Sequence, residues 1–534
     1  MSYILLSILS LSQGVLGESY KPQGKADATS EFEVGTQIRA WTMQDEGMDY
    51  LLDNMQSMAG INDLYMVVVM HKEHRPFRAP EFPHNPARDS WQAEDSRVTF
   101  FPEMSRYGKI KPRFSKHKWI RETDWLRLMV EAARARGLST GAEVSHFPIP
   151  KALLKANPDW QMKTIDGTPW SADRFCPNNP VVREYLIALY GDLAANYDLD
   201  YIQTCQRLFN HNEIDDGGTC FCKYCMAEAK VTGFDLEAAI PILKKDINAE
   251  PQKSQWLKFR CDSSTKLYRE LSEKIKQENP DCHLRLNDIW FWEGGRGAID
   301  SGLDLKAVAP FLGSIVNQDH TEQKGRKNEG FALRKKWLSV NRAFLGPDKP
   351  LICGIAPRMD ASPKLVKEGI KVALEHPAKI NGLALKHYDG ASFSLLRAFK
   401  QGMIDAGVQG LTPTLGKEIE EMELENYVVF SEELVEEWGV ETKGTGKASY
   451  TFDNPSGLYD IRITYFDEEE GQSKVTLKVA DQEKASFKMD EDVDCWRWRL
   501  FKNIQVNAGD SITLIGEADG NEQAKLDFIE FIPH

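Results

Sequence analysis

Long apolar runs and an excess of positive charge are both missing from this sequence. Beyond the first 17 residues, no segment approaches the roughly 18 to 20 apolar residues that a membrane span needs. The 66 Lys and Arg are outnumbered by 80 Asp and Glu, which gives a net charge of -14. The lack of long apolar runs leads us to expect no membrane span. The negative net charge, with no run of Lys and Arg interleaved with aromatic residues, leads us to expect no nucleic acid as a partner.

A glycine-rich phosphate-binding turn and a fully pairable set of cysteines are absent too. A doubly wound dinucleotide-binding fold would need such a turn after its first strand, but none follows Ile38. The nine cysteines are an odd number, so they cannot all pair in disulfides. We expect no organic cofactor.

The N-terminus is an apolar stretch that ends in small residues. It runs from Met1 to Leu16, and Val15 and Gly17 precede a polar segment. This is typical of a signal peptide cut near Gly17, although the basic start is missing, and a short buried helix is the alternative. We therefore interpret residues 1–17 as a signal peptide and expect a secreted or periplasmic protein.

Residues 27–415 alternate short apolar, β-rich runs with amphipathic helical stretches. Such alternation indicates repeated βα units and a parallel sheet, in the α/β class. Eight strands over roughly 390 residues favour a (β/α)8 TIM barrel with long loops after the strands. The predicted strands are 32–38, 63–70, 138–144, 199–205, 283–288, 314–318, 350–355 and 380–386.

After Gly416 the pattern changes to short alternating strands separated by Gly, Asn and Asp. This predicts an all-β sandwich domain at residues 420–534. We expect the sandwich to fold separately, so that its deletion leaves turnover of soluble substrates largely intact. Trp496 and Trp498 lie two apart on one predicted strand and point to the same face, which is either a sugar platform or part of the core.

Three cysteines, Cys220, Cys222 and Cys225, form a C-x-C-x-x-C motif. Thiols this close cannot all satisfy disulfide geometry among themselves, but they can surround a tetrahedral metal. Cys176, after the third strand, is the predicted fourth ligand, and Cys205 is the alternative. Zinc bound by four thiolates would be structural, because no coordination position stays open. The competing interpretation is a group of free or partly oxidised cysteines.

The motif resembles the zinc-carrying β-galactosidases of glycoside hydrolase family 42, in which an Asn-Glu pair shortly precedes C-x-C-x-x-C. Here the pair is Asn212 and Glu213. The segment from Asn157 through Cys176 is also similar to a group of hypothetical barrel glycosidases. The resemblance covers residues 120–230 by motif and the rest of the barrel by layout. It implies a glycoside hydrolase with Glu213 as general acid, although strand four ends in uncharged residues where the hypothetical group often has an acid.

Carboxylates gather at the predicted ends of the barrel strands, where barrel enzymes build their active sites. Glycoside hydrolysis normally needs two carboxyl groups, one to protonate the leaving oxygen and one to act as nucleophile or to activate water. The candidates for catalysis are Glu213, Asp288, Asp389 and Glu143, and Asp319, Glu322 and Asp360 lie on the same predicted rim. Residues placed to bind the sugar are His71, His146, Trp290, Trp292, Arg358, His387 and Tyr388. An arginine there would favour an anionic sugar.

The C-terminal segment resembles the β-sandwich carbohydrate-binding modules that accompany glycosidases, on the strength of Glu423, Glu425 and the ending around Asp527. In that group, paired early glutamates and a late aspartate help to hold a structural calcium ion, which prefers oxygen ligands. The resemblance implies a calcium site at these three residues.

The best hypothesis is a glycoside hydrolase that acts on an extracellular or periplasmic oligo- or polysaccharide through paired carboxylates. One alternative is a catalytically silent glycan-binding protein that kept the barrel. The other is a polysaccharide lyase-type enzyme, which would use Tyr388 or His387 as a base beside an acidic sugar.

Overall fold

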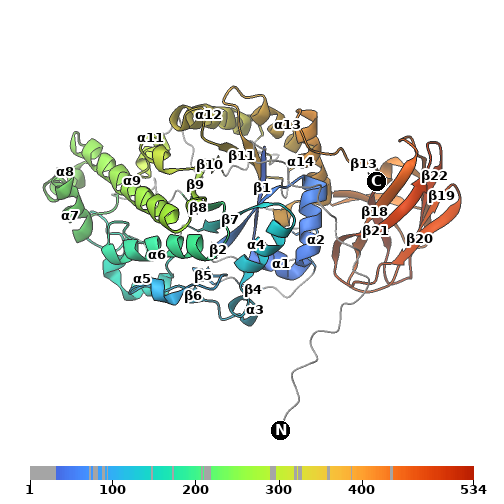
Figure 1. Ribbon diagram of the computed structural model, residues 1–534, viewed down its shortest axis with the longest axis horizontal. Helices are drawn as coiled ribbons and strands as arrows, with labels where there is room; N and C mark the ends of the chain where they lie inside the picture. The colour runs from blue at the N-terminus through green and yellow to red at the C-terminus, as the bar shows by residue number, and fades with distance from the viewer. Residues whose placement is uncertain are drawn as a thin grey trace, which may run out of the picture.

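The computed structural model describes residues 32–70, 74–75, 82–86, 91–92, 94–145, 148–170, 174–205, 209, 218–288, 296–317, 322, 327–357, 361–386, 388–432 and 437–534. The barrel occupies the middle of the molecule, and the C-terminal β domain lies at one end of the long axis (Figure 1). Helices α7 (Lys223–Val231) and α8 (Leu236–Lys245) lie at the other end.

Eight parallel strands close into a barrel, because the last strand pairs with the first. In spatial order they are β1 (Glu33–Ile38), β2 (Asp63–Val69), β7 (Ser139–Val144), β8 (Tyr201–Cys205), β9 (His283–Asp288), β10 (Ser314–Asn317), β11 (Leu351–Ile355) and β12 (Gly382–Leu385). Barrel strands are covered on both faces, so they form nearly continuous apolar runs; all seven residues of β2 are buried. The predicted TIM barrel is confirmed, and each strand lies within two residues of its predicted bounds.

Helices surround the barrel, and side-chain caps fix where several of them begin. Asn179 accepts hydrogen bonds from two backbone amides at the start of α6, with Pro180 at the first helical position. Ser362 and Ser392 each accept a hydrogen bond from one backbone amide at the start of α13 and of α14. The helices are α1 (Ala40–Glu46), α2 (Met48–Asp53), the π-helical turn η1 (Asn54–Met58), α3 (Lys118–Arg121), α4 (Trp125–Ala135), α5 (Lys151–Ala156), α6 (Pro180–Asn196), α9 (Gln252–Glu278), α10 (Arg296–Asp300), α11 (Leu305–Val308), α12 (Lys327–Leu345), α13 (Pro363–Leu374) and α14 (Phe393–Asp405). Short strands β3 (His74–Arg75), β4 (Trp91–Gln92), β5 (Arg97–Val98) and β6 (Arg113–Phe114) lie between β2 and α3.

The C-terminal domain is a sandwich of two antiparallel sheets with its own apolar core. It begins at β13, ten residues after α14 ends at Asp405. One sheet has the order β15 (Val428–Glu432), β16 (Glu437–Thr442), β23 (Ala524–Pro533), β18 (Gly457–Asp467) and β21 (Cys495–Val506), and β13 (Leu415–Glu418) also pairs with β23. The other has the order β14 (Glu423–Glu425), β17 (Thr445–Thr451), β22 (Ser511–Glu517), β19 (Lys474–Val479) and β20 (Gln482–Lys488).

The sandwich packs against the barrel through β21. Trp496 is 1% exposed and belongs to the same apolar cluster as the barrel core, as does Phe466 of β18. Trp498 stacks on Tyr50 of α2 with ring centroids 4.9 Å apart. The face that carries both tryptophans therefore meets the barrel, and of the two sequence alternatives the core interpretation holds for Trp496.

The N-terminal end of the barrel is closed by a buried polar cluster. Arg285 of β9 donates to both carboxylate oxygens of Glu33, at 2.8 and 2.7 Å, and its guanidinium lies 3.4 Å from the centre of the Tyr201 ring. The Tyr201 hydroxyl donates to Asp63 at 2.5 Å. Polar groups at this end of a TIM barrel usually contribute to stability, since TIM-barrel enzymes have their active sites at the opposite end.

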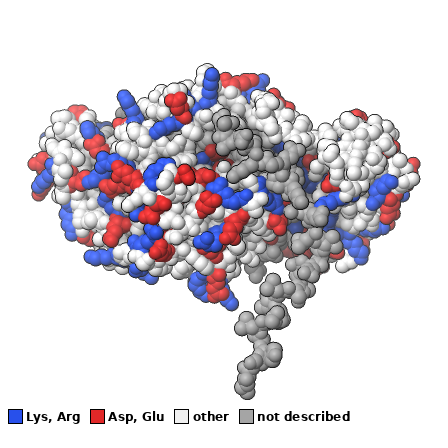
Figure 2. Space-filling model, in the orientation of Figure 1, with Lys and Arg blue, Asp and Glu red and all other residues white. Residues whose placement is uncertain are grey.

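The surface carries charges of both signs. Figure 2 shows Lys and Arg interspersed with Asp and Glu across the barrel on the displayed face. No helix among the described residues combines the length and apolar composition that a membrane crossing requires.

Candidate functional site

Glu143 is the buried acid at the C-terminal end of the barrel. It lies one residue before the end of β7 and is 5% exposed. Its Oε2 accepts hydrogen bonds from Gln37 Nε2 on β1 and from Gln203 Nε2 on β8, both at 2.6 Å. Gln203 is paired directly with Glu143 across the β7–β8 register. Two amides from different strands thus fix one carboxylate oxygen, and Oε1 takes part in neither bond.

Two buried cations accompany Glu143. Lys386 follows β12 and donates to the Tyr65 hydroxyl at 2.8 Å, and Arg39 follows β1. Burial raises the pKa of Glu143, while the positive charge of Lys386 and the Gln37 hydrogen bond lower it, and the net shift is upward. A carboxyl group that holds its proton more readily than an exposed glutamate suits general acid catalysis.

Asp389 and Tyr388 lie in a single turn of 3-10 helix, η8 (Tyr388–Gly390), directly after β12. Asp389 is buried, and its Oδ2 lies 3.4 Å from Arg39 Nη1. Its Oδ1 is buried without a hydrogen-bond partner among the described residues. Arg39 also lowers the pKa of Glu143, so one guanidinium influences two predicted catalytic carboxyl groups.

Tyr388, predicted to contact the sugar, is fully buried. Its hydroxyl donates to Glu46 Oε2 at 2.8 Å and accepts from Asn54 Nδ2 at 3.1 Å. These contacts make it a support for the turn that carries Asp389. Glu322 is likewise engaged in the interior, where it pairs with Arg334 at 2.6 Å and accepts from the Ala356 amide at 3.1 Å.

Several predicted residues fall outside the described part of the chain and stay predictions. The backbone of Asp288 ends β9, but its side chain is not described. The others are Glu213, His71, His146, Trp290, Trp292, Arg358, His387, Asp319 and Asp360, together with the signal-peptide segment 1–17.

Sequence reasoning missed Gln37, Gln203 and Arg39, which lie around Glu143 together with Lys386. The three are neutral or basic, and a search for paired carboxylates passes over them. Only their positions in the sequence could have indicated a site. Each of these polar residues lies within an apolar strand near its carboxyl end, or directly follows such a strand.

The four predicted cysteines converge. Cys176 Sγ lies 3.4 Å from Cys222 Sγ and 3.5 Å from Cys225 Sγ. All four sulfurs, including that of Cys220, lie within 4.8 Å of one another. These separations exceed the roughly 2.05 Å of a disulfide bond. They approach the roughly 3.8 Å between sulfurs that bind one tetrahedral zinc at about 2.3 Å. Cys176 is thus the fourth member of the cluster.

Neighbouring donors support the cysteine cluster. The Lys163 amide donates to Cys220 Sγ and Asn178 Nδ2 donates to Cys225 Sγ, both at 3.4 Å. Such bonds stabilise thiolates, the form in which cysteine binds metal. The donor set therefore fits a closed structural zinc site. The cluster lies within a separate apolar core that joins the loop after β8 to α7, α8 and the start of α9.

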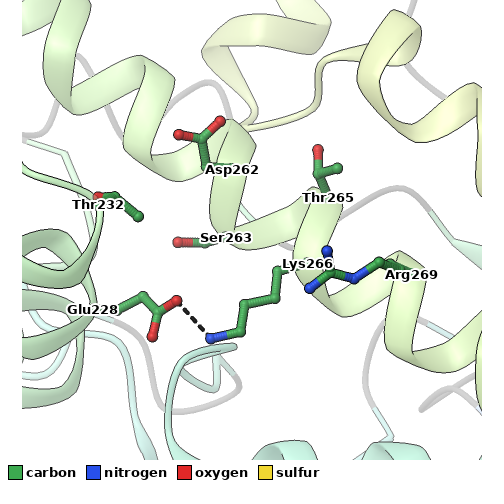
Figure 3. A pocket seen from close by; sticks show the side chains of 7 residues that line it. All are labelled: Glu228, Thr232, Asp262, Ser263, Thr265, Lys266 and Arg269. Atoms are coloured by element: carbon green, nitrogen blue, oxygen red, sulfur yellow. Dashed lines mark hydrogen bonds and ion pairs between the residues drawn. The ribbon is translucent and has the colours of Figure 1, made fainter.

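A pocket next to this cluster lies between α7 and α9 (Figure 3). Its volume is about 240 Å³, and it contains an ion pair between Lys266 and Glu228 at 2.6 Å. Ser263, which lines it, accepts from Asn178 at 2.9 Å. Ligand pockets usually span about 300 to 1,000 Å³. The pocket is small, its charges are paired, and it contains none of the predicted catalytic residues.

The acidic cluster of the sandwich differs from the predicted one. Asp527 lies with Glu418 and Glu420, and one oxygen from each lies within 4.8 Å of the others. Glu423 and Glu425 are exposed on β14 in the opposite sheet, where Glu425 pairs with Lys447 at 2.9 Å. The structure therefore groups Asp527 with Glu418 and Glu420, and not with the predicted Glu423 and Glu425.

Arg397 of the barrel helix α14 reaches into this acidic cluster. Its Nη2 lies 3.1 Å from Asp527 Oδ2 and 3.4 Å from Glu418 Oε2. Burial raises the pKa of Glu418 to about 7 and that of Asp527 to about 6. Three carboxylates and one guanidinium leave two negative charges in excess when all are ionised. The set fits a divalent cation that prefers oxygen ligands.

No protein-family model matches the chain. Part of it is 34% identical over 101 residues to probable α-glucuronidase A of Aspergillus terreus, a match that covers 17% of this chain and 12% of the relative. A match to the α-glucuronidase of Hypocrea jecorina is 25% identical over 132 residues and covers 22% of this chain and 16% of that one. The chain thus spans less than a fifth of the length of these relatives.

Among solved structures, the glycoside hydrolase domain of PgaB (BpsB) from Bordetella bronchiseptica is similar in fold. The TM-score is 0.51 at 13% sequence identity, and the match covers 72% of this chain and all of that domain. The likeness places the barrel in a fold that a glycoside hydrolase domain also uses. The resemblance to family 42 stays a prediction.

Proposed function

We propose that this chain is a glycoside hydrolase that cleaves its substrate at the carboxyl ends of the barrel strands. Glu143 carries the proposal: it is a buried carboxyl group, oriented by two amides and flanked by two cations, at the end where TIM barrels place their active sites. The partial similarity to α-glucuronidases and the fold shared with a glycoside hydrolase domain support the same class.

The two carboxyl groups required for the reaction are proposed to be Glu143 and Asp389. Glu143 suits the general acid because burial favours its protonated form. Asp389, held near Arg39 with its other oxygen unbonded among the described residues, suits the nucleophile or the base that activates water. Glu213, the acid suggested by the family resemblance, is the competing choice.

The proposed substrate is an α-linked glucuronic acid residue of an oligo- or polysaccharide. Arg39 and Lys386 bring two positive charges beside Glu143, and a uronic acid carries the negative charge that such groups bind. The relatives are named for glucuronides. Because residues 1–17 are typical of a signal peptide, we propose that the protein meets its substrate outside the cytoplasm.

A panel of aryl glycosides tests the proposal. We expect wild-type protein to release 4-nitrophenol from the α-glucuronide and much less from the α-glucoside, which differs by a hydroxymethyl group in place of the carboxylate. If the protein binds glycans but cleaves no member of the panel, the result would favour the alternative of a catalytically silent glycan-binding protein. Formation of an unsaturated sugar would indicate a lyase.

Replacing Lys386 by Met should reduce the preference for the glucuronide over the glucoside by about 10- to 150-fold, because hydrogen bonds to charged groups contribute about 1.5 to 3 kcal/mol. The ratio of kcat/KM values measures this, and effects on Glu143 that are common to both substrates cancel in it. Lys400→Met is the matched control, since Lys400 is also buried but donates to Ser57 at the sandwich interface. An unchanged ratio in Lys386→Met would show that Lys386 does not bind the carboxylate.

We also propose two structural metals. Zinc would be held by Cys176, Cys220, Cys222 and Cys225, whose sulfurs all lie within 4.8 Å of one another. Calcium would be held by Glu418, Glu420 and Asp527, where Glu420 Oε2 is buried without a hydrogen-bond partner among the described residues. Both would stabilise the fold and take no part in the reaction.

Calcium should raise the thermal midpoint of the wild-type protein and should not do so in Asp527→Asn. At 100 times its dissociation constant, an ion that binds only the folded state stabilises it by about 2.7 kcal/mol. Glu425→Gln is the control and should keep the calcium response, because Glu425 lies in the opposite sheet. A midpoint that does not respond to calcium in wild type would mean that Arg397 alone balances the cluster.

A further inference from the structure

We infer that the β-sandwich is part of the catalytic unit, because Trp498 positions the turn Tyr388–Asp389 through the barrel residue Asn54. The inference rests on the proposed function in one respect, which is the role of Asp389 in the reaction. It replaces the expectation that deleting the sandwich leaves turnover of soluble substrates intact.

The contact begins with a hydrogen bond between the domains. Trp498 Nε1 of β21 donates to Asn54 Oδ1 at 2.6 Å, and the indole stacks on Tyr50 at an interplanar angle of 13°. Nearby, the Trp496 amide donates to the Pro83 carbonyl at 2.8 Å. The strand that carries Trp498 is thus fixed to the barrel on both sides of Arg497, whose guanidinium also lies over the Tyr50 ring.

Asn54 carries the contact into the barrel. It is fully buried, and its Nδ2 donates to the Tyr388 hydroxyl at 3.1 Å and lies 3.5 Å from Glu46 Oε2. Tyr388 donates to the same Glu46 oxygen at 2.8 Å. His84 closes the group, with Nδ1 3.2 Å from Glu46 Oε1 and its ring stacked on Phe393 of α14.

The group is connected to Asp389 at two points. Tyr388 is the residue directly before Asp389 in the same helical turn. Arg39, which approaches Asp389 at 3.4 Å, directly precedes α1, and Glu46 is the last residue of that helix. The positions of Tyr388 and Glu46 therefore determine how the turn after β12 lies against the start of α1.

The side chains involved have little room to rearrange. Asn54 and Tyr388 are both 0% exposed, so loss of the indole N–H leaves Asn54 Oδ1 without its donor in a site closed to solvent. Without that donor, the Asn54 amide can rotate toward another partner for its oxygen. Because its Nδ2 donates to the Tyr388 hydroxyl, such a rotation would move that hydroxyl and the adjoining Asp389.

The test compares Trp498→Phe with Trp438→Phe in the full-length protein. Phenylalanine keeps an aromatic ring on Tyr50 and removes the N–H donor. Trp438 is 53% exposed on β16 and is the matched control. On the aryl glucuronide we expect kcat to fall by about 10- to 100-fold in Trp498→Phe with a smaller change in KM, because small misplacements of a reacting group are costly. Trp438→Phe should match wild type.

A second measurement needs no activity. In protein labelled with 15N-tryptophan, the indole resonance of Trp498, identified by its loss in Trp498→Phe, should shift in Asp389→Asn and Tyr388→Phe while that of Trp438 stays in place. If wild type cleaves no glycoside, the proposed function fails and this shift still decides the coupling. A Trp498 resonance that Asp389→Asn leaves unmoved, or wild-type kcat in Trp498→Phe, overturns the inference.

Discussion

Glu143→Gln should lower kcat/KM on an α-glucuronide with a poor leaving group by about 10²- to 10⁴-fold, the usual contribution of general acid–base catalysis. Glutamine keeps the shape of the side chain, and its carbonyl oxygen can still accept from Gln37 and Gln203, but it has no transferable proton. Activated aryl leaving groups need less protonation, so the loss on them should be smaller. Steady-state kinetics on both substrates measure the difference.

The control is Asp63→Asn. Asp63 is an equally buried carboxyl group at the opposite end of the same barrel, where Tyr201 donates to it. This variant should lower the thermal midpoint and leave kcat of the folded protein near that of wild type. Equal losses of kcat in both variants would mean that Glu143 contributes to stability and not to the reaction.

The pH profile gives an independent check on Glu143. Its pKa is raised, so its proton is retained to higher pH than in an exposed glutamate, and activity that needs the acid falls as pH rises through that pKa. This alkaline limb should be absent from the residual activity of Glu143→Gln.

Cys225→Ser should release zinc and unfold the region around α7 and α8. Structural zinc sites in small domains contribute apparent binding free energies of about 10 to 16 kcal/mol, which exceeds the stability of most domains. We expect one zinc per wild-type chain by elemental analysis, none in the variant, and a thermal midpoint lower by several degrees or more. Treatment of wild type with a strong chelator should have the same effect.

Cys282→Ala is the matched control for the cysteine cluster. Cys282 is a fully buried free thiol that precedes β9 and lies outside the cluster. It should keep its zinc and show only the modest destabilisation of a shortened core residue. Wild-type protein purified without chelator that contains no zinc would contradict the zinc proposal.

The barrel could be predicted from the sequence because its strands are covered on both faces. Residues such as those of β2 and β11 are buried without interruption, so each strand stands out as an apolar run between polar loops. The sandwich was predicted from the alternation of its strands. The packing of β21 on the barrel was not, because an apolar face directed at another domain has the same pattern as one directed at a core.

The candidate site could be predicted only in part. Glu143 and Asp389 were named because the chemistry requires carboxylates at strand ends, and both lie buried there. Gln37 lies 106 residues from Glu143 in the sequence, and Gln203 lies 60 residues from it. Their contacts with Glu143 therefore depend on how the strands of the barrel come together.

The acidic cluster of Glu418, Glu420 and Asp527 was also predicted only in part. The run from Glu418 to Glu425 contains more than one Glu-x-Glu pair. The pairing of β13 with β23 sets Glu418 opposite Phe528, next to Asp527. Glu423 and Glu425 continue into β14, which pairs with β17 in the other sheet. The composition of the segment does not distinguish Glu418 and Glu420 from Glu423 and Glu425. The pairing of the strands distinguishes them.

Hydrolysis in 18O-labelled water tests the central proposal most directly. Wild-type protein would be incubated briefly with an oligosaccharide that carries an α-linked glucuronic acid, and the masses of the products would be measured by mass spectrometry. Glucuronic acid incubated alone is the blank for exchange of its anomeric oxygen with water. We predict one 18O in each released glucuronic acid above that blank, and a release slower by about 10²- to 10⁴-fold after Glu143→Gln. Intact oligosaccharide, or an unsaturated product without 18O, would contradict the assignment of this chain as a glycoside hydrolase.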